Sequence, residues 1–152
     1  LAEFEAYGYP EDPNIYNVAS LARVTASSAD VNTGRSRAVK AVDGKKTSRT
    51  DNQWIITDKA KEVWIKLDWE REHYVDKVML YNLLNPRNKI KNSLLQLSDG
   101  SIFNIQQSSK DGMCRIINIS KNNIKWIKYM INNTKGYKTG LSEIEVYGKA
   151  IN

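Results

Sequence analysis

Two glutamates near the end of the chain are the acidic residues whose spacing is best suited to chemistry. Glu143 and Glu145 alternate with Ile144 and Val146, which is the period of a half-buried strand. Both carboxylates should therefore point to the same face of that strand, about 7 Å apart. Such a spacing could suit a carboxylate pair in acid–base catalysis, but the residues around it supply no accompanying group for that chemistry.

The other chemically versatile residues also give little sign of catalysis. The single histidine, His73, lies in a charged stretch between expected strands and is predicted to be a solvated turn residue. The single cysteine, Cys114, excludes an intrachain disulfide and is predicted to pack in an apolar run. The sequence has no nucleophile elbow, phosphate-binding loop, dinucleotide fingerprint or Cys-x-x-Cys pair. We therefore expect that this protein is not an enzyme.

Composition indicates one folded domain. The chain has 152 residues, of which 41% are hydrophobic, with four tryptophans and eight tyrosines, and this suits a single globular core. The net charge of +6 comes from scattered lysines and arginines, so we expect a solvated basic surface and no nucleic-acid partner. No apolar run approaches the ~20 residues of a membrane span, and a membrane partner is not expected.

The elements that must position these residues are mostly strands. Alternation of apolar and polar residues marks a strand over 63–68, and others are expected over 75–84, 94–97, 102–106, 113–119 and 126–131. Turn signals separate them at 70–72, 85–88, 98–100, 110–112 and 121–123. One helical turn is expected over 37–42, stopped by Asp43 and Gly44. Short strands at regular spacing favour an antiparallel sandwich.

The two ends of the chain carry nearly the same motif. Residues 1–8 read LAEFEAYG and residues 141–148 read LSEIEVYG, which differ only at the second, fourth and sixth positions. This repeat predicts that residues 1–8 are the closing strand of a preceding homologous domain, with a proline-containing linker over 9–13 and one complete domain over 14–152. The alternative is that the two segments are the first and last strands of one domain and are similar by chance.

An ordered series of motifs resembles discoidin-like domains, also called coagulation factor V/VIII type C domains. The series comprises NVA at 17–19, VTASS at 24–28, AVKAVDG at 38–44, Trp54, VWIKLD at 63–68, VDKV at 75–78, LSDG at 97–100 and GLSEIEVYG at 140–148. It is most similar to bacterial galactose-binding-like modules, including family 32 carbohydrate-binding modules. The resemblance implies an all-β fold, an eight-stranded antiparallel jelly-roll β-sandwich of the galactose-binding-domain-like type. The chain lacks the terminal cysteine pair of animal members, which makes their lipid-binding or receptor roles less expected.

The resemblance also implies a structural calcium ion near the first helical turn. By position its ligands would be the carbonyls of Lys40, Lys45, Ser48 and Ser142 and the carboxylates of Asp43 and Glu143. Hard carboxylate and carbonyl oxygens are the ligands that calcium prefers. Relatives often carry Asp or Asn in place of Lys45 and Thr in place of Ser48. The alternative is that Asp43 caps a turn while Lys45 or Lys46 pairs with Glu143.

A sugar site is implied at loops on one end of the sandwich, over 31–37, 47–53, 83–92 and 135–139. Planar polar groups and one aromatic ring could bind sugar hydroxyls and the C–H face of the ring. The candidates are Arg87, Asn92, Tyr137, Asn85, Asn88, Arg49, Asp51 and Asn52. The four tryptophans are instead expected to pack in the core or at strand edges; they are Trp54, Trp64, Trp69 and Trp126.

These expectations combine into one function. The chain is expected to be a non-catalytic glycan-binding module of a larger, secreted bacterial protein, located outside the cell or at its surface. Its partners would be a glycan, such as one containing galactose or N-acetylhexosamine, and other domains of the same polypeptide, including a preceding homologous copy. Two alternatives stay open: a discoidin-type module that adheres to a protein or an anionic membrane surface, and a structural spacer.

Overall fold

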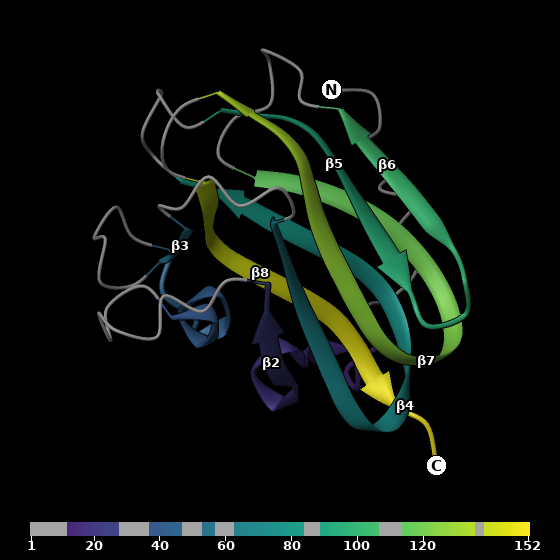
Figure 1. Ribbon diagram of the computed structural model, residues 1–152. Helices are drawn as coiled ribbons and strands as arrows, with labels where there is room; N and C mark the ends of the chain where they lie inside the picture. The colour runs from purple at the N-terminus through teal and green to yellow at the C-terminus, as the bar shows by residue number, and fades with distance from the viewer. Residues whose placement is uncertain are drawn as a thin grey trace, which may run out of the picture.

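Strands make up most of this computed structural model, which describes residues 12–27, 37–46, 53–56, 63–83, 89–106, 114–135 and 139–152 (Figure 1). In chain order the elements are β1 (Tyr16–Asn17), the 3-10 helix η1 (Ala19–Leu21), β2 (Arg23–Ala26), the 3-10 helix η2 (Ala38–Val42), β3 (Trp54–Ile56), β4 (Val63–Asn82), β5 (Lys89–Leu97), β6 (Ile102–Gln106), β7 (Cys114–Lys135) and β8 (Thr139–Ala150). Neither of these helices has the length or apolar character that crossing a bilayer requires.

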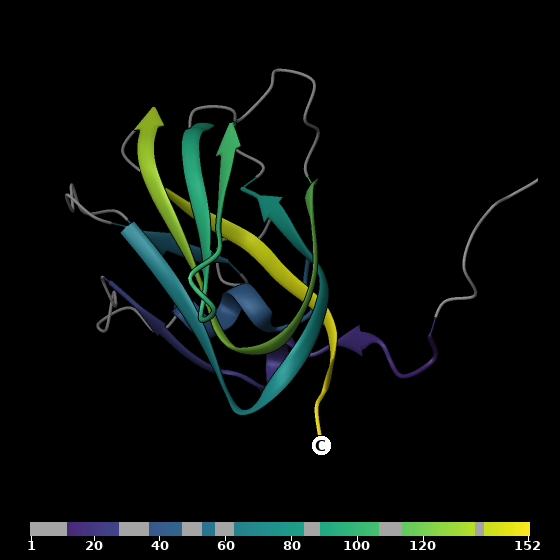
Figure 2. The same ribbon diagram turned by 90° about the vertical axis from the view of Figure 1, so that its right-hand side faces the viewer.

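Two long strands, β4 and β7, contribute to both layers of the sandwich. The first part of β4 pairs with β2 and with the last part of β7, and β5 and β6 extend this layer. The second part of β4 pairs with the first part of β7 and with β8, which also pairs with β1 and β3. All pairings are antiparallel. Figure 2 shows both long strands bending where they pass between the layers. The expected eight-stranded antiparallel jelly roll is thus confirmed.

Two of the expected turns are wrong, because the long strands bend there and do not end. Residues 70–72 and 121–123 do not end strands, because β4 and β7 continue through them with register shifts in their pairing. The polar residues at 70–72 are exposed at the bend, and this exposure gives the same sequence signal as a loop. The expected turn over 98–100 is confirmed, since the Gly100 N–H donates to the Leu97 carbonyl at 3.0 Å and Gly100 has φ +90°.

The core lies between the layers and follows the expected alternation. Val63, Ile65 and Leu67 point inward and are buried. Trp54 and Trp69 are also buried, and the Trp69 indole N–H donates to the Val18 carbonyl at 2.9 Å. The packing role expected for these two tryptophans is confirmed.

The other two tryptophans lie on the outer face of central strands. Trp64 and Trp126 are half-buried in β4 and β7. The Lys128 ammonium lies 4.6 Å from the ring centroid of Trp64, and the Lys66 ammonium lies 4.7 Å from that of Trp126. Their packing partners are therefore lysine side chains in cation–π contacts and not the core or a sheet edge.

His73 is not the solvated turn residue that its charged neighbours indicated. It lies within β4 and is only 5% exposed. Its Nδ1 is 2.9 Å from the Arg71 carbonyl oxygen, and its ring centroid is 5.1 Å from that of Trp69. Because the strand continues through the bend, alternation turns this side chain inward.

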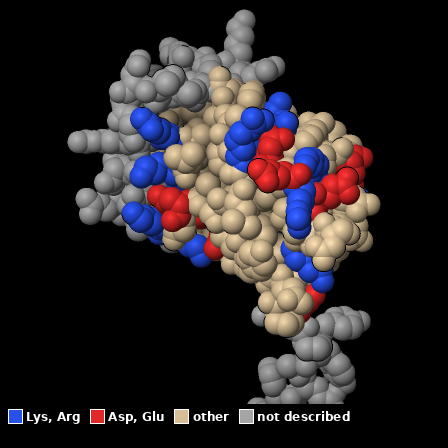
Figure 3. All heavy atoms as spheres, turned by 90° about the horizontal axis from the view of Figure 1, so that it is seen from below, with Lys and Arg blue, Asp and Glu red and all other residues tan. Residues whose placement is uncertain are grey.

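Charges of both signs are mixed over the surface. On the face seen in Figure 3, lysines and arginines lie among aspartates and glutamates around an uncharged area. Ion pairs join Lys121 to Asp99 at 3.5 Å and Lys149 to Asp12 at 2.7 Å. The second pair ties the first described residue to β8. The expected closing strand over 1–8 lies outside the described residues, as does most of the linker expected over 9–13.

Candidate functional site

The strand ends that border the expected sugar-binding loops meet at one end of the sandwich, at the upper left of Figure 1. In β8, Leu141 is the register partner of both Asn82, where β4 ends, and Trp54, where β3 begins. In the other layer, Lys89 at the start of β5 pairs with Lys135 at the end of β7. The fold therefore brings the borders of three of the expected loops, 47–53, 83–92 and 135–139, to one end, although residues 89–92 belong to strand β5 and not to a loop.

Of the predicted sugar-binding residues, the structure describes Asn92. It lies on β5 near the loop end, its side chain is exposed, and its register partners are Gln106 and Asn133. The other candidates lie outside the described residues; they are Arg87, Tyr137, Asn85, Asn88, Arg49, Asp51 and Asn52.

Gly140 allows the close backbone approach that joins β3 to this end. A Cβ built on Gly140 would lie 1.8 Å from the Trp54 carbonyl oxygen, and the residue has φ +153°. Only glycine fits such a contact without moving one strand away from the other.

The second candidate site is a pair of carboxylates, Asp43 and Glu143. Asp43 ends η2 and accepts a hydrogen bond through Oδ1 from the Lys45 N–H at 2.9 Å. Glu143 is fully buried on β8 and accepts a hydrogen bond through Oε1 from the Gly44 N–H at 2.9 Å. The second oxygens, Asp43 Oδ2 and Glu143 Oε2, are buried and have no hydrogen-bond partner among the described residues.

This arrangement is unfavourable for two negative charges. Burial raises the pKa of the Glu143 carboxyl to about 8, and the charges of Asp43 and Glu145 act in the same direction. The Gly44 N–H and Lys46 oppose this shift in part. Buried carboxylate oxygens without partners are costly unless a cation or proton is bound.

The structure shows no ion pair between Glu143 and Lys46, one of the two lysines expected as its partner in the alternative to calcium. Lys46 pairs with Glu145 at 3.2 Å and lies 4.6 Å from the ring centroid of Tyr81, whose hydroxyl donates to Glu145 at 2.7 Å. Lys45 is exposed. The network around Glu145 was not predicted from the sequence, although the placement of Glu143 and Glu145 on one face was the available signal.

The residues present fit a calcium ion. The turn after η2 holds Asp43 and Lys45, η2 itself holds Lys40, and Ser142 is buried beside Glu143 on β8. Ser48 lies outside the described residues. In the part of the chain that the structure describes, no three carboxylate, imidazole or thiol groups gather around one point. Backbone carbonyls would therefore have to complete the coordination, as they commonly do for calcium.

Comparison with solved structures defines the class of fold. The lectin-binding domain of Lectinolysin, in a mutant form complexed with Lewis b, superposes with a TM-score of 0.73 at 19% identity over 90% of this chain and 97% of that one. An F5/8 type C domain from Bacteroides fragilis gives 0.69 at 16% identity over 92% and 100%. The family 32 CBM from C. perfringens NanJ, in complex with galactose, gives 0.67 at 13% identity over 88% and 98%. The fold is that of the discoidin-like, F5/8 type C domains, as the sequence motifs implied.

Sequence comparison then gives the family. The chain belongs to the family described as Domain of unknown function (DUF7402), whose model matches residues 17–147. No curated protein matches the chain in sequence.

Proposed function

We propose that this chain is a non-catalytic sugar-binding module whose site is formed by loops at one end of the sandwich. The observation that carries the proposal is that the strands bordering three loops end together, so that side chains from all three can contact one ligand. Rigid strands that present variable loops are a common basis for ligand binding.

The structural neighbours support a glycan as the ligand class. The Lectinolysin domain is complexed with Lewis b, and the NanJ module is complexed with galactose. In this chain Arg87 and Asn92 would hydrogen-bond sugar hydroxyls, and the ring of Tyr137 would contact the C–H face of a sugar. A shallow site of this kind buries little area, so affinity in the micromolar to millimolar range is expected.

We also propose that calcium binds between the turn after η2 and β8. Asp43 and Glu143 would supply carboxylate oxygens, and Lys40, Lys45, Ser48 and Ser142 would supply carbonyls. The support is the pair of buried, unpartnered oxygens on Asp43 and Glu143. When bound, the ion would neutralise the two carboxylates and cross-link the turn to the closing strand.

The third proposal concerns the setting of the module. The motif at 141–148 has a structural reason at several of its positions: Leu141, Ile144 and Val146 are core residues, and a Cβ on Gly148 would lie 2.2 Å from the Tyr74 carbonyl oxygen. The same pattern at residues 1–8 therefore supports the end of a preceding homologous domain. We place the chain in a larger, secreted or surface-bound bacterial protein, where several weak modules would act together.

A glycan array with the full chain tests the sugar-binding proposal. We expect signal on a restricted set of glycans that is lost in Arg87→Ala and Tyr137→Ala, while melting temperatures stay near that of the unmodified protein. Arg23→Ala, which changes an exposed arginine on β2, is the matched control and should bind normally. Absence of signal on every glycan, together with sedimentation on anionic liposomes, would replace this proposal with membrane adhesion.

A further inference from the structure

Strand β6 forms one edge of its layer, at the right of Figure 1, and β5 is its one partner among the described strands. The five residues of β6 include neither a charged residue nor a proline, and its pairing with β5 has no bulge. Folded proteins commonly protect edge strands by such features, because an open edge can pair with a strand of another molecule. The strand at the opposite edge of the layer, β2, does carry a charge, since it begins with Arg23.

The turn before β6 determines which of its backbone groups face the open edge. The Leu97 N–H donates to the Ser101 carbonyl at 2.9 Å, so these two residues form a hydrogen-bonded pair. Because hydrogen-bonded and non-hydrogen-bonded pairs alternate in antiparallel strands, Phe103 and Ile105 also bond to β5. The alternate residues of β6 direct their N–H and C=O groups away from β5, towards the open edge. They are Ile102, Asn104 and Gln106.

The side chains of β6 divide between the two faces of the layer. Ile102 is 57% exposed on the outer face, where Asn104 and Gln106 are exposed beside it. Phe103 and Ile105 face the core, and Phe103, the less deeply buried of the two, packs against the rim of the core. The edge therefore has a polar row with one isoleucine on its outer face and an apolar pair on its inner face.

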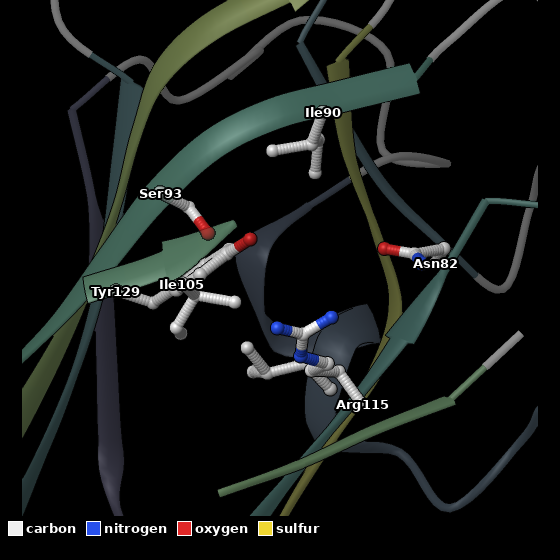
Figure 4. A pocket seen from close by; sticks show the side chains of 7 residues that line it. Asn82, Ile90, Ser93, Ile105, Arg115 and Tyr129 are labelled. Carbon is white, nitrogen blue, oxygen red and sulfur yellow. The ribbon is translucent and has the colours of Figure 1, made fainter. Parts of the chain in front are cut away.

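Ile105 also lines a small inter-layer pocket. Figure 4 shows it there with Ser93 from β5 and with Asn82 and Arg115 from the opposite layer. The pocket has room for about one water molecule, so a partner residue cannot enter the core through it. A partner that binds on this side of the molecule would therefore bond to the edge of β6.

The hairpin that carries this edge is nearly free of charge. Residues 92–109 include one charged residue, Asp99, in a chain whose residues are 26% charged. Asp99 is itself paired with Lys121 at 3.5 Å. Two copies of a chain with a net charge of +6 repel each other, and the repulsion is weakest where neither surface is charged. The hairpin is thus a surface by which a second copy can approach.

We propose that β6 pairs antiparallel with β6 of a second copy, so that one layer of each molecule joins in a continuous sheet. A twofold axis at Asn104 would place Ile102 opposite Gln106 of the second copy, and each outward N–H and C=O group would bond across the axis. On the core face, Phe103 would lie opposite Ile105 of the second copy in a close, non-hydrogen-bonded pair. This complementarity on both faces favours a second copy over an unrelated extended peptide.

The geometry of the pair has a consequence for binding. A contact through five residues is small, so the dimer should be weak and should exchange with the monomer. Because the two β6 strands run antiparallel, the loop ends of the two copies would lie at opposite ends of the joined sheet. The dimer would therefore link two glycan-bearing surfaces. This consequence rests on the proposed sugar-binding function, whereas the dimer itself does not.

Sedimentation equilibrium of the full chain over about 10 μM to 1 mM tests the pairing in the range of weak dissociation constants. We expect the average mass to rise with concentration towards that of a dimer. The rise should be larger at high salt, because salt screens the repulsion between two positive copies. Asn104→Lys would place two lysines opposite each other at the axis and should weaken the dimer by about tenfold or more. Asn118→Lys, the same change at an exposed position of β7 in the other layer, is the matched control and should keep the dimer.

Two further variants test the backbone contacts and the register. Asn104→Pro removes an N–H that faces the open edge and keeps the bonds to β5, so it should also weaken the dimer by about tenfold or more while the monomer still unfolds cooperatively. Asn104→Cys should form a covalent dimer with oxidised glutathione, because Cα atoms of a hydrogen-bonded antiparallel pair are about 5.5 Å apart, a distance that a disulfide spans. Asn118→Cys is the control, which also accounts for Cys114, and should give no covalent dimer.

The remaining outcomes would overturn the inference. A protein that stays monomeric up to about 1 mM at low and high salt has no such contact. A dimer that Asn104→Lys and Asn104→Pro leave unchanged uses another surface, and a dimer that weakens with salt depends on ion pairs that β6 lacks. Equal weakening by Asn104→Lys and Asn118→Lys would assign the effect to net charge and not to the edge.

Discussion

At the scale of single residues, Asp43 and Glu143 are the clearest departure from a core stabilised by apolar packing. Glu143 is fully buried, and one oxygen of each carboxylate has no partner among the described residues. Groups arranged in this way destabilise the folded state unless a cation or a proton binds, and their presence supports the proposed calcium ion.

Calcium should therefore stabilise the protein against heat. At a concentration about a hundredfold above its Kd, an ion that binds only the folded state adds about 2.7 kcal/mol to the free energy of unfolding. For a domain of this size that corresponds to a rise in Tm of roughly 5–10 °C. Glu143→Gln should abolish the rise, whereas Glu72→Gln, an exposed glutamate at the bend of β4, should keep it. Scanning calorimetry with calcium and with chelator makes the measurement, and identical Tm values would count against the ion.

Without divalent ions, the stability of the protein should fall as pH rises. The pKa of Glu143 is raised from 4.5 to about 8, so between these values the folded protein holds a proton that the unfolded chain has released. The free energy of unfolding then decreases with rising pH across this window. Denaturant unfolding in chelator at pH 5 and pH 8 measures the change. Glu143→Gln should reduce the difference, and a free energy that increases towards pH 8 would be the contrary result.

At the scale of elements, the buried rows of the long strands could be predicted from the sequence, and the bends in these strands could not. Alternation predicted the buried row of Val63, Ile65 and Leu67, because a period of two follows directly from strand geometry. The bend at 70–72 was misread as a turn, because exposed polar residues mark both a loop and a corner where a strand changes layers. The local sequence does not show whether a strand ends at such residues or continues and pairs with a different strand beyond them. The burial of His73 was not predicted for the same reason.

The approach of β3 to β8 should depend on Gly140. Gly140→Ala would place a Cβ against the Trp54 carbonyl and should lower the free energy of unfolding by about 3 kcal/mol, while disturbing the end that bears the loops. Gly100→Ala is the matched control: Gly100 has φ +90° but open space around it, so the cost should be only about 1 kcal/mol. Urea unfolding compares the two. Equal losses in the free energy of unfolding would show that the contact of the Gly140→Ala Cβ with the Trp54 carbonyl costs nothing beyond the backbone strain.

At the scale of the whole molecule, the sequence motifs predicted the jelly roll and brought Asp43 and Glu143 into one proposed site. They did not predict the inter-layer pocket. Asn82 and Arg115 lie on paired strands of one layer, and Ser93 lies on β5 in the other layer, so these residues meet only because the two layers face each other. Spatial proximity of this kind depends on topology, which no local pattern encodes.

The function proposed for the molecule is sugar binding at one end of a rigid sandwich, and Asn92 is the described residue that tests it most directly. Asn92 is exposed at the loop end of β5, whereas Asn122 is exposed near the bend of β7, away from that end. Calorimetric titration of a glycan identified on the array should show about tenfold weaker binding for Asn92→Ala, or roughly 1.4 kcal/mol, and unchanged binding for Asn122→Ala. Unchanged affinity in Asn92→Ala, or equal loss in both variants, would contradict the location of the site.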